Sequence, residues 1–495
     1  MSFSERTAGT SDWMRTLSEH YRRTRLEFPD DELCIVFDID GTIIDLRHLI
    51  VHVLIDYDRT HGTDHFRGLV AGEITHHEDD IERVLESLAA PPAARHDIVE
   101  FYRRHLWDRA ATLAASKPYE GVFGVIRWFQ LQPLTHVALN TGRAHHLRDV
   151  TLESLNTIGA SYRVRFEPEL LLTSDGTTDV PSNKVAAIRE LHRRGLRVVA
   201  VVDNEPENLR AMALADEHEE ILFLHAETIF RSQRLLQDRV VAGQRYRLRD
   251  LVPDRQLPSR VEFVWHGVND PSNLERFLAS DVRWAEVDVR RDPLGRLVLR
   301  HDGFDECPWR RGEPTLLAEM AVRSIIEEGR SVKLDLKEGG PTLTDVSDLV
   351  SDMGIDAERV WLNSELPVLG ESGFEWLRRR FPQSTISAPV DFLPPLMRVS
   401  EEATTHTLRV LRRWGVSRLS LRWSPLGVGR LIEDLESQGW KINLYDITDL
   451  ETFLEASLLL PASITADFSF PEWRYFGRGS GARDHVQPFD EEDVG

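Results

Sequence analysis

The chain has 495 residues, and its 82 acidic against 60 basic side chains give a formal net charge of -22. This excess of negative charge argues against nucleic acid or an anionic membrane as the main partner. The length suits two or three domains, and two cysteines are too few for a disulfide framework. The apolar runs are shorter than the roughly 18 residues of a membrane span, and the polar N-terminus lacks a signal-peptide core, so we expect a soluble cytoplasmic enzyme.

Residues 1–30 are expected to form an N-terminal extension. The segment 33–45, LCIVFDIDGTIID, then begins as an apolar run typical of a buried strand and ends in Asp38 and Asp40. Side chains two residues apart on a strand point the same way, so the two carboxylates meet at one strand end. Gly41 lets the backbone turn tightly above them. Such oxygen ligands suit Mg²⁺, so the segment predicts a magnesium and phosphate site.

Helical periodicity follows from about residue 46 to residue 125, in segments such as DDIERVLESLAA and DIVEFYRRHLWDRAATLAA. The pattern predicts a helical insertion after the first strand. We expect Asp45, His48 and His61 within it to be exposed or satisfied in the core rather than to face a substrate.

Further polar residues follow at predicted strand ends and at a helix start. VALNTGR is a strand that ends in Thr141, and VVAVVDNEPEN is a strand that ends in Asp203, while Lys184 opens the helix SNKVAAIREL. Lysine is rare in this chain, where most basic residues are arginine. This indicates that position 184 retains lysine because a compact ammonium group is needed there. The lysines are at positions 117, 184, 333, 337 and 441.

DxDGT at Asp38, TGR at Thr141, Lys184 and Asp203 together resemble the motifs of the haloacid dehalogenase (HAD) superfamily, mostly phosphatases that work through an aspartyl-phosphate. The resemblance implies that Asp38 is the nucleophile and Asp40 the general acid and base. The insertion at about 46–125 resembles the helical cap of that family. The implied phosphate ligands are Thr141, Gly142, Arg143 and Lys184, and the implied Mg²⁺ ligands are Asp38, the Asp40 carbonyl and Asp203, with Glu207 beside them.

The strand ILFLHA is followed by a run at 228–243 that we predict as a helix. It closes an HAD-like phosphatase domain expected to span residues 31–247. Residues 248–259 are rich in arginine and proline, which is typical of a linker.

From Val261 onward, short apolar strands alternate with helical stretches. Eight such strand and helix units indicate a TIM barrel over residues 260–475, with a doubly wound open sheet as the alternative. The polar, acidic residues 476–495 are predicted to be disordered. The predicted fold class is therefore α/β, an HAD-like Rossmannoid domain with a helical cap followed by a (β/α)8 TIM barrel. The expected strands are residues 261–268, 284–290, 331–337, 359–366, 384–390, 416–423, 441–447 and 462–468.

Polar residues stand at nearly every carboxyl end of these strands, where TIM barrels place their active sites. Alternate positions share a face, so Glu286 should converge with Asp288, and Asp335 with Lys337. Three carboxylates crowded inside a barrel would repel one another unless a divalent cation joined them. The strand-end set is His266, Glu286, Asp288, Asp335, Lys337, Asn363, Glu365, Arg422, Tyr445 and Asp467.

WHGVND at His266, the ExD pair at Glu286, the hairpin RRDPLGRLVLRHD with His301, and Asp335 in KLDLKE resemble glycerophosphodiester phosphodiesterase (GDPD)-like barrels. WHGVND, KLDLKE and VWLNSE are most similar to the menorin-type branch. Gly267 departs from the family, which usually has an arginine there that touches phosphate. The resemblance implies that Glu286, Asp288 and Asp335 bind Mg²⁺ or Ca²⁺, that Lys337 and Asn363 hold phosphate, and that His266 and His301 serve as base and acid.

The sequence thus predicts a bifunctional, metal-dependent hydrolase of small-molecule phosphate esters. A phosphodiesterase releases a monoester, which a phosphomonoesterase hydrolyses, so the pairing suggests two sequential steps. Two alternatives stay open for the barrel: it binds a ligand without catalysis, or it transfers a phosphoester to an alcohol instead of water.

Overall fold

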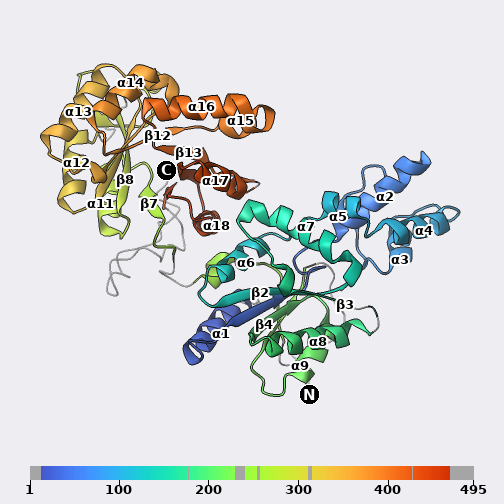
Figure 1. Ribbon diagram of the computed structural model, residues 1–495. Coiled ribbons are helices and arrows are strands. Elements are labelled where there is room, and N and C mark those ends of the chain that lie inside the picture. Colours follow the sequence, from blue (N-terminus) through green and yellow to red (C-terminus); the bar gives the residue numbers. More distant parts are fainter. Residues whose placement is uncertain are drawn as a thin grey trace, which may run out of the picture. The chain divides into compact units, whose positions relative to one another are not determined.

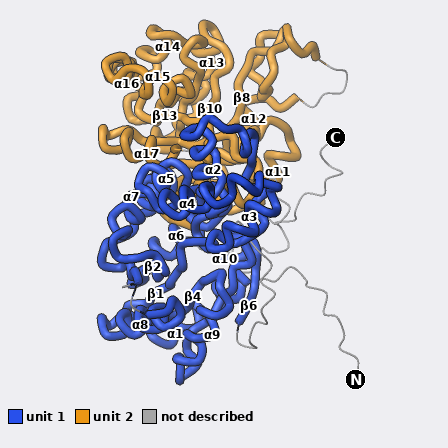
Figure 2. Tube along the Cα trace, turned by 90° about the vertical axis from the view of Figure 1, so that its right-hand side faces the viewer, with its two compact units in different colours: residues 1–253 blue, residues 254–495 orange. Residues whose placement is uncertain are grey.

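The computed structural model describes residues 13–174, 176, 178–228, 240–252, 257–309, 315–425 and 427–468. The chain divides into two compact units, Met1–Pro253 and Asp254–Gly495 (Figure 2). Within the described ranges, no helix has both the length and the apolar character needed to cross a membrane. The predicted acidic tail at 476–495 lies outside the described residues.

Unit 1 is built on a parallel sheet whose described strands follow the order β3-β2-β1-β4-β5-β6. Every residue of β1 is buried, as expected for a parallel strand covered on both faces. The central position of β1 puts Asp38, its next residue, in the middle of the carboxyl edge of the sheet. The strands are β1 Leu33–Phe37, β2 Thr135–Ala144, β3 Leu171–Ser174, β4 Arg197–Asp203, β5 Leu222–Ala226 and β6 Val240–Gly243.

Helices cover both faces of this sheet (Figure 1). Helices α8 (Val180–Arg193) and α9 (Pro206–Ala215) pack against one face, where Leu191 and Leu209 join an apolar core with the strands. The other face carries α6 (Val122–Gln130) and α7 (Arg148–Gly159). This layering leaves the carboxyl edge of the sheet open to the segments that follow each strand.

The predicted helical insertion is present as a group of helices between β1 and α6 (Figure 1). Because α6 packs against β2, we define the helical insertion as the helices from Arg47 to Ala115. Tyr57 of one helix meets Phe101 of another edge to face, with ring centroids 5.5 Å apart. The helices are α2 Arg47–His61, α3 Ile81–Ser87, α4 Arg95–His105 and α5 Arg109–Ala115.

The helix predicted at 228–243 is wrong for its last four residues. Val240–Gly243 is strand β6, which pairs in parallel with β5 and places Val240 beside Phe223. The sequence VVAG begins with two β-branched residues, and β-branched side chains fit a pleated strand better than a helix. The preceding residues 229–239 lie outside the described part of the chain.

The predicted N-terminal extension contains helix α1 (Trp13–Glu27), which contacts β4, β5 and β6. The Trp13 indole nitrogen donates to the Arg245 carbonyl at 2.7 Å, and the Trp13 ring lies 4.9 Å from that of Tyr246. A Cβ at Gly243 would lie only 2.2 Å from the Trp13 ring. Helix α10 (Leu248–Leu251), at the start of the predicted linker, also packs on α1.

In the described part of unit 2, eight parallel strands close into a barrel in the order β10-β11-β12-β13-β14-β15-β7-β8, with β8 paired to β10. The TIM barrel prediction is therefore confirmed, and the open-sheet alternative is wrong. Strand β9 (Leu297–Leu299) pairs antiparallel with β8 and forms the predicted hairpin. The barrel strands are β7 Glu262–Trp265, β8 Trp284–Arg291, β10 Ser331–Leu336, β11 Val360–Asn363, β12 Thr385–Pro389, β13 Arg418–Arg422, β14 Lys441–Ile447 and β15 Ser463–Ala466.

Helices surround the barrel (Figure 1), and the strand register fixes which side chains meet inside it. Asp288 of β8 pairs with Asp335 of β10, which in turn pairs with Asn363 of β11. Neighbouring apolar residues such as Val287 and Leu334 alternate with them and are fully buried. The helices are α11 Pro271–Ala279, α12 Ala318–Glu327, α13 Pro341–Asp352, α14 Leu366–Arg380, α15 Leu393–Val399, α16 Glu401–Trp414, α17 Val428–Ser437 and α18 Leu450–Leu458.

Gly243→Ala should destabilise unit 1 by about 1–3 kcal/mol, because the added methyl group overlaps the buried Trp13 ring and forces it to move. Thermal and urea unfolding of the full chain would measure the loss. Gly72→Ala is the matched control, since a Cβ there meets nothing within 4 Å. Equal stability of the two variants would contradict the close packing of α1 on β6.

Candidate active sites

The first site lies at the carboxyl edge of the unit 1 sheet, where a buried ammonium joins two carboxylates. Lys184 Nζ is 2.6 Å from Asp38 Oδ1 and 2.9 Å from Asp203 Oδ2. It also donates to the Asn140 carbonyl at 2.5 Å, and Asn140 Nδ2 donates back to the Lys184 carbonyl. Asp38 follows β1, Asp203 ends β4 and Lys184 is on α8, so three of the predicted residues meet.

Burial and charge act against each other at this site. Burial is the main cause that raises the pKa of Asp38, to about 7; Asp203 and Asp40 act in the same direction, and Lys184 opposes them. Burial would lower the pKa of Lys184, but the carboxylates of Asp203 and Asp38 outweigh it and raise that pKa. Lys184 therefore stays charged, and the ionisation of Asp38 depends on the cations beside it.

The turn after Asp38 is shaped by Asn204. With its amide nitrogen facing the turn, Asn204 donates to the Asp40 carbonyl at 2.9 Å and to Asp38 Oδ2 at 3.1 Å. Gly41 has φ +78°, and a Cβ there would lie 2.3 Å from the Asn204 side chain. The glycine of the DxDG segment is therefore required both by its backbone angle and by this contact.

The carboxylate of Asp40 is turned towards Arg143. Arg143 Nε donates to Oδ2 at 2.7 Å and Nη2 donates to Oδ1 at 2.6 Å. The remaining guanidinium nitrogen donates to Thr151 at 3.0 Å, and the group lies 4.8 Å above the centre of the Trp107 ring. Arg143, expected to hold phosphate, is thus paired with Asp40.

The other residues expected at this site lie close by. Thr141 is buried, and its hydroxyl accepts from the backbone nitrogen of Arg143 at 3.2 Å, with Gly142 between them. Asn208 donates to both carboxylate oxygens of Asp203 at 3.3 Å. Glu207, expected beside the metal, is exposed.

The second site is a cluster of buried carboxylates inside the barrel. One oxygen from each of Glu286, Asp288 and Asp335 lies within 4.8 Å of the others, and among the described residues no other such group of three occurs. Lys337 Nζ is 2.9 Å from Asp288 Oδ1 and 2.7 Å from Asp335 Oδ2. An ammonium therefore offsets part of the repulsion that the sequence led us to expect.

Hydrogen bonds fix the orientation of each carboxylate in this cluster. Asn269 Nδ2 donates to Asp288 Oδ2 at 2.6 Å, while its oxygen accepts from the Asp288 backbone nitrogen at 2.8 Å. Gly267 N donates to Glu286 Oε2 at 2.9 Å, and Asn363 Nδ2 donates to Asp335 Oδ1 at 2.8 Å. The predicted residues Asp335, Lys337 and Asn363 are thus brought together.

Burial and neighbouring charges shift the pKa values of Glu286, Asp288 and Lys337 in different directions. Burial, followed by the charge of Asp288, raises the pKa of Glu286. Burial also acts on Asp288, but the Lys337 ammonium outweighs it and lowers the pKa of Asp288. For Lys337, burial is outweighed by Asp335 and Asp288, so its pKa is raised.

The two histidines predicted as base and acid lie in different surroundings. His266 Nδ1 is 2.6 Å from Asp467 Oδ1. Burial would lower the pKa of His266, but the hydrogen bond to Asp467 and the charge of Glu286 raise it to about 9. His301 is two-thirds exposed and pairs with Asp302 at 2.8 Å, and within the described residues it makes no hydrogen bond or ion pair with the cluster.

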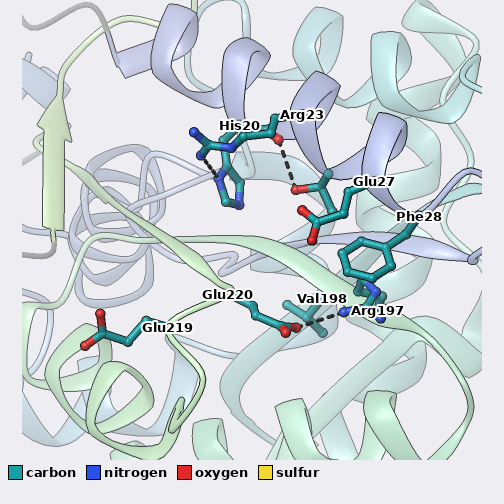
Figure 3. A pocket seen from close by; sticks show the side chains of 9 residues that line it. His20, Arg23, Glu27, Phe28, Arg197, Val198, Glu219 and Glu220 are labelled. Atoms are coloured by element: carbon teal, nitrogen blue, oxygen red, sulfur yellow. Dashed lines mark hydrogen bonds and ion pairs between the residues drawn. The ribbon is translucent and has the colours of Figure 1, made fainter.

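A separate cavity of about 210 Å³ lies at the amino end of β4 in unit 1 (Figure 3). Two pairs of its lining side chains are hydrogen-bonded: Arg23 donates to His20 at 3.0 Å, and Arg197 donates to Glu220 at 2.8 Å. Asp203 ends the same strand, about 20 Å away at the usual rise per residue. The cavity is therefore apart from the catalytic candidates.

Some side chains that contact the predicted site residues could not be identified from the sequence. Trp107 and Thr151 come from two different helical regions, and only folding brings them to Arg143. Asn204 and Asn269 do stand inside the quoted motifs, directly after Asp203 and three residues after His266. An amide beside a cluster of carboxylates is a hydrogen-bond donor to them, and this chemistry could have pointed to both.

No family model matches the chain, and no curated protein matches it. Among solved structures, a phosphodiesterase from Oleispira antarctica, in complex with the product sn-glycerol-3-phosphate, matches with 14% identity and a TM-score of 0.33, over 43% of this chain and 94% of that chain. A glycerophosphodiester phosphodiesterase from Agrobacterium tumefaciens matches with 15% identity and a TM-score of 0.31, over 42% and 96%. A HAD-superfamily hydrolase, subfamily IA, from Geobacter sulfurreducens matches with 14% identity and a TM-score of 0.30, over 45% and 96%.

Asp467→Asn should lower stability at pH 6 by up to about 1 kcal/mol, a small value because the His266 pair is half exposed. The pKa of His266 is raised from 6.5 to about 9, so the stabilisation is fully present below pH 6.5 and is lost as pH rises through 9. Urea unfolding with chelator at pH 6 and pH 10 tests this. A loss that stays the same at both pH values, or that matches the exposed control Asp302→Asn, would contradict the assignment.

Proposed function

We propose that the chain is a bifunctional, metal-dependent phosphoester hydrolase, with a phosphomonoesterase in unit 1 and a phosphodiesterase in unit 2. One observation carries the proposal. In each unit, buried carboxylates and a lysine converge at the carboxyl ends of parallel strands. Phosphoryl transfer needs such an arrangement, since catalysis there is mostly positioning and neutralisation of charge.

In unit 1, a carboxylate oxygen of Asp38 would attack phosphorus while the bond from phosphorus to the alcohol oxygen breaks. Asp40 would give its proton to that oxygen. Water would then attack the aspartyl-phosphate, with Asp40 taking the proton, to release inorganic phosphate and restore Asp38. Lys184 and Thr141 would hold the phosphate oxygens, which is consistent with the ammonium position beside Asp38.

The donors in unit 1 fit a hard divalent cation. Asp38 Oδ2 and the Asp40 carbonyl both lie about 3 Å from the Asn204 amide nitrogen, and Asp203 reaches the same Lys184 as Asp38. Oxygen donors that converge in this way suit Mg²⁺, which would neutralise the phosphate charge.

In unit 2, Glu286, Asp288 and Asp335 fit Mg²⁺ or Ca²⁺, because their oxygens lie close enough to share one ion. Such an ion would polarise the phosphodiester. Water would attack phosphorus while the bond from phosphorus to the alcohol oxygen breaks, and His301 would take the proton of that water. Lys337 and Asn363 would hold a phosphate oxygen, and His266, which the barrel favours in its protonated form, would give its proton to the departing alcohol oxygen. These roles are the reverse of those that the resemblance implies, in which His266 is the base and His301 the acid.

The two activities are chemically complementary. Hydrolysis of a diester leaves a phosphomonoester, and this monoester is the kind of substrate that unit 1 would consume. We therefore propose that one small-molecule phosphodiester passes through both reactions.

Asp38→Asn should abolish Mg²⁺-dependent hydrolysis of an aryl phosphate, with a loss on the order of 10⁴-fold or more, because the amide keeps the shape and loses the nucleophile. Steady-state kinetics of the full chain measure this, and an unchanged melting temperature shows that the fold is intact. Asp179→Asn is the matched control, since that carboxylate is exposed and caps α8, and asparagine is also a good cap. Turnover near wild type in Asp38→Asn would rule out the aspartyl-phosphate.

With bis(p-nitrophenyl) phosphate, the intact chain should release both nitrophenol groups and then inorganic phosphate. Asp38→Asn should stop at the monoester, whereas Glu286→Gln should leave the diester unchanged, since it removes one metal ligand. Product analysis with Mg²⁺, Mn²⁺ and Ca²⁺ separates these outcomes. Glu262→Gln, at the amino end of β7 and paired with Arg418, is the matched control in the same barrel.

Retained metal binding in a barrel that hydrolyses no diester would favour a ligand-binding barrel. An alkyl phosphodiester formed when an alcohol is added would favour a transferase. If the Glu286→Gln variant still releases phosphate from the diester, the proposal of two sequential reactions is contradicted.

A further inference from the structure

Both carboxylate oxygens of Asp40 are occupied by one guanidinium. The two nitrogens of Arg143 approach them at 2.7 and 2.6 Å, which is the bidentate geometry of a strong charge-assisted pair. The Arg143 side chain is 4% exposed and that of Asp40 is 16% exposed. Water therefore competes little for this pair.

The position of Arg143 is fixed from two other elements. Its third nitrogen donates to Thr151 of α7 at 3.0 Å, and its flat face lies 4.8 Å from the Trp107 ring. Trp107 stands between α4 and α5 of the helical insertion. The guanidinium is thus held between the sheet edge and the insertion, on the carboxylate two residues after Asp38.

This pairing conflicts with the proposed reaction. As a general acid, Asp40 must direct an oxygen to the leaving group, whereas the bidentate guanidinium occupies both of its oxygens. A bound phosphate presents a second anion to the same guanidinium. Phosphate also accepts bidentate hydrogen bonds from arginine, so Asp40 and phosphate are competing partners.

We propose that Arg143 exchanges partners: it holds Asp40 until a phosphate group binds, and then turns to the phosphate and releases Asp40 for proton transfer. The inference rests on the proposed function of unit 1. Trp107 and Thr151 keep the guanidinium within reach of both anions during the exchange. Phosphate binding and release of the general acid are therefore one coupled event.

A double-mutant cycle on the full chain tests this exchange. Orthophosphate affinity would be measured by calorimetry with Mg²⁺ for wild type, Asp40→Asn, Arg143→Met and the double variant. Binding of phosphate to the barrel is common to all four chains and cancels in the cycle. Asp40→Asn keeps the main-chain carbonyl and removes the competing charge, so phosphate should bind more tightly, on the order of tenfold, than in wild type.

The effect of Asp40→Asn on phosphate affinity, measured in the Arg143→Met variant, distinguishes the exchange of partners from simple repulsion between Asp40 and phosphate. If Asp40 weakens phosphate binding only because both are negative, Asp40→Asn tightens binding equally with or without Arg143, and the proposal fails. If the two anions share Arg143, the gain disappears in Arg143→Met. Melting temperatures of all four chains show that each is folded, and Arg143→Lys, which keeps the charge without the fork, should retain only part of the coupling.

Failure of this inference can be told apart from failure of the proposed function. Aryl phosphate turnover that depends on Asp38, together with equal effects of Asp40→Asn in both backgrounds, overturns the exchange alone. Absence of both aryl phosphate turnover and phosphate binding in the wild-type chain overturns both proposals.

Discussion

The burial of like charges at the ends of parallel strands is the constraint on which both sites depend. Carboxylates that leave water must be neutralised, and a nearby cation is the direct way to do it. In unit 1 the Lys184 ammonium joins Asp38 and Asp203, and in unit 2 Lys337 joins Asp288 and Asp335. Among the described residues no lysine forms an ion pair with Glu286, and burial, followed by the charge of Asp288, raises its pKa. The neutralisation is therefore incomplete in the barrel, and a divalent cation would complete it.

The sequence was sufficient to predict the parts of the fold that depend on local pattern. Apolar runs predicted the barrel strands, and alternation along β8 and β10 predicted which charged side chains share the interior. Strand β6 was missed because its four residues follow a run with helix period, and only pairing with β5 decides between strand and helix. At the sites, residue type and order indicated Asp38, Lys184 and the barrel carboxylates. The bond between Asp40 and Arg143 could not be predicted, because it depends on how the helical insertion and α7 place Trp107 and Thr151.

The departure of this barrel from the pattern it resembles is local. At Gly267, where the GDPD-like pattern usually has an arginine, the backbone nitrogen donates to Glu286 and the φ of +67° suits glycine. The departure from the pattern therefore leaves the Glu286 carboxylate with its backbone donor. His266, beside Gly267, pairs with Asp467, which directly follows the neighbouring strand β15.

The choice between lysine and arginine follows the geometry of each pair. Of the five lysines, Lys184 and Lys333 are fully buried and Lys337 is largely so, whereas positions 117 and 441 are exposed. A compact ammonium fits between two carboxylates that approach from different strands, as at Lys184, because its donors are not confined to one plane. Arg143 instead donates to both oxygens of a single carboxylate, and the planar guanidinium matches that bidentate geometry. A guanidinium can donate two hydrogen bonds to a carboxylate or to a phosphate with the same planar geometry. An ammonium bound by several fixed oxygens has no such freedom, so in the proposed exchange Lys184 keeps its partners while the guanidinium of Arg143 changes its own.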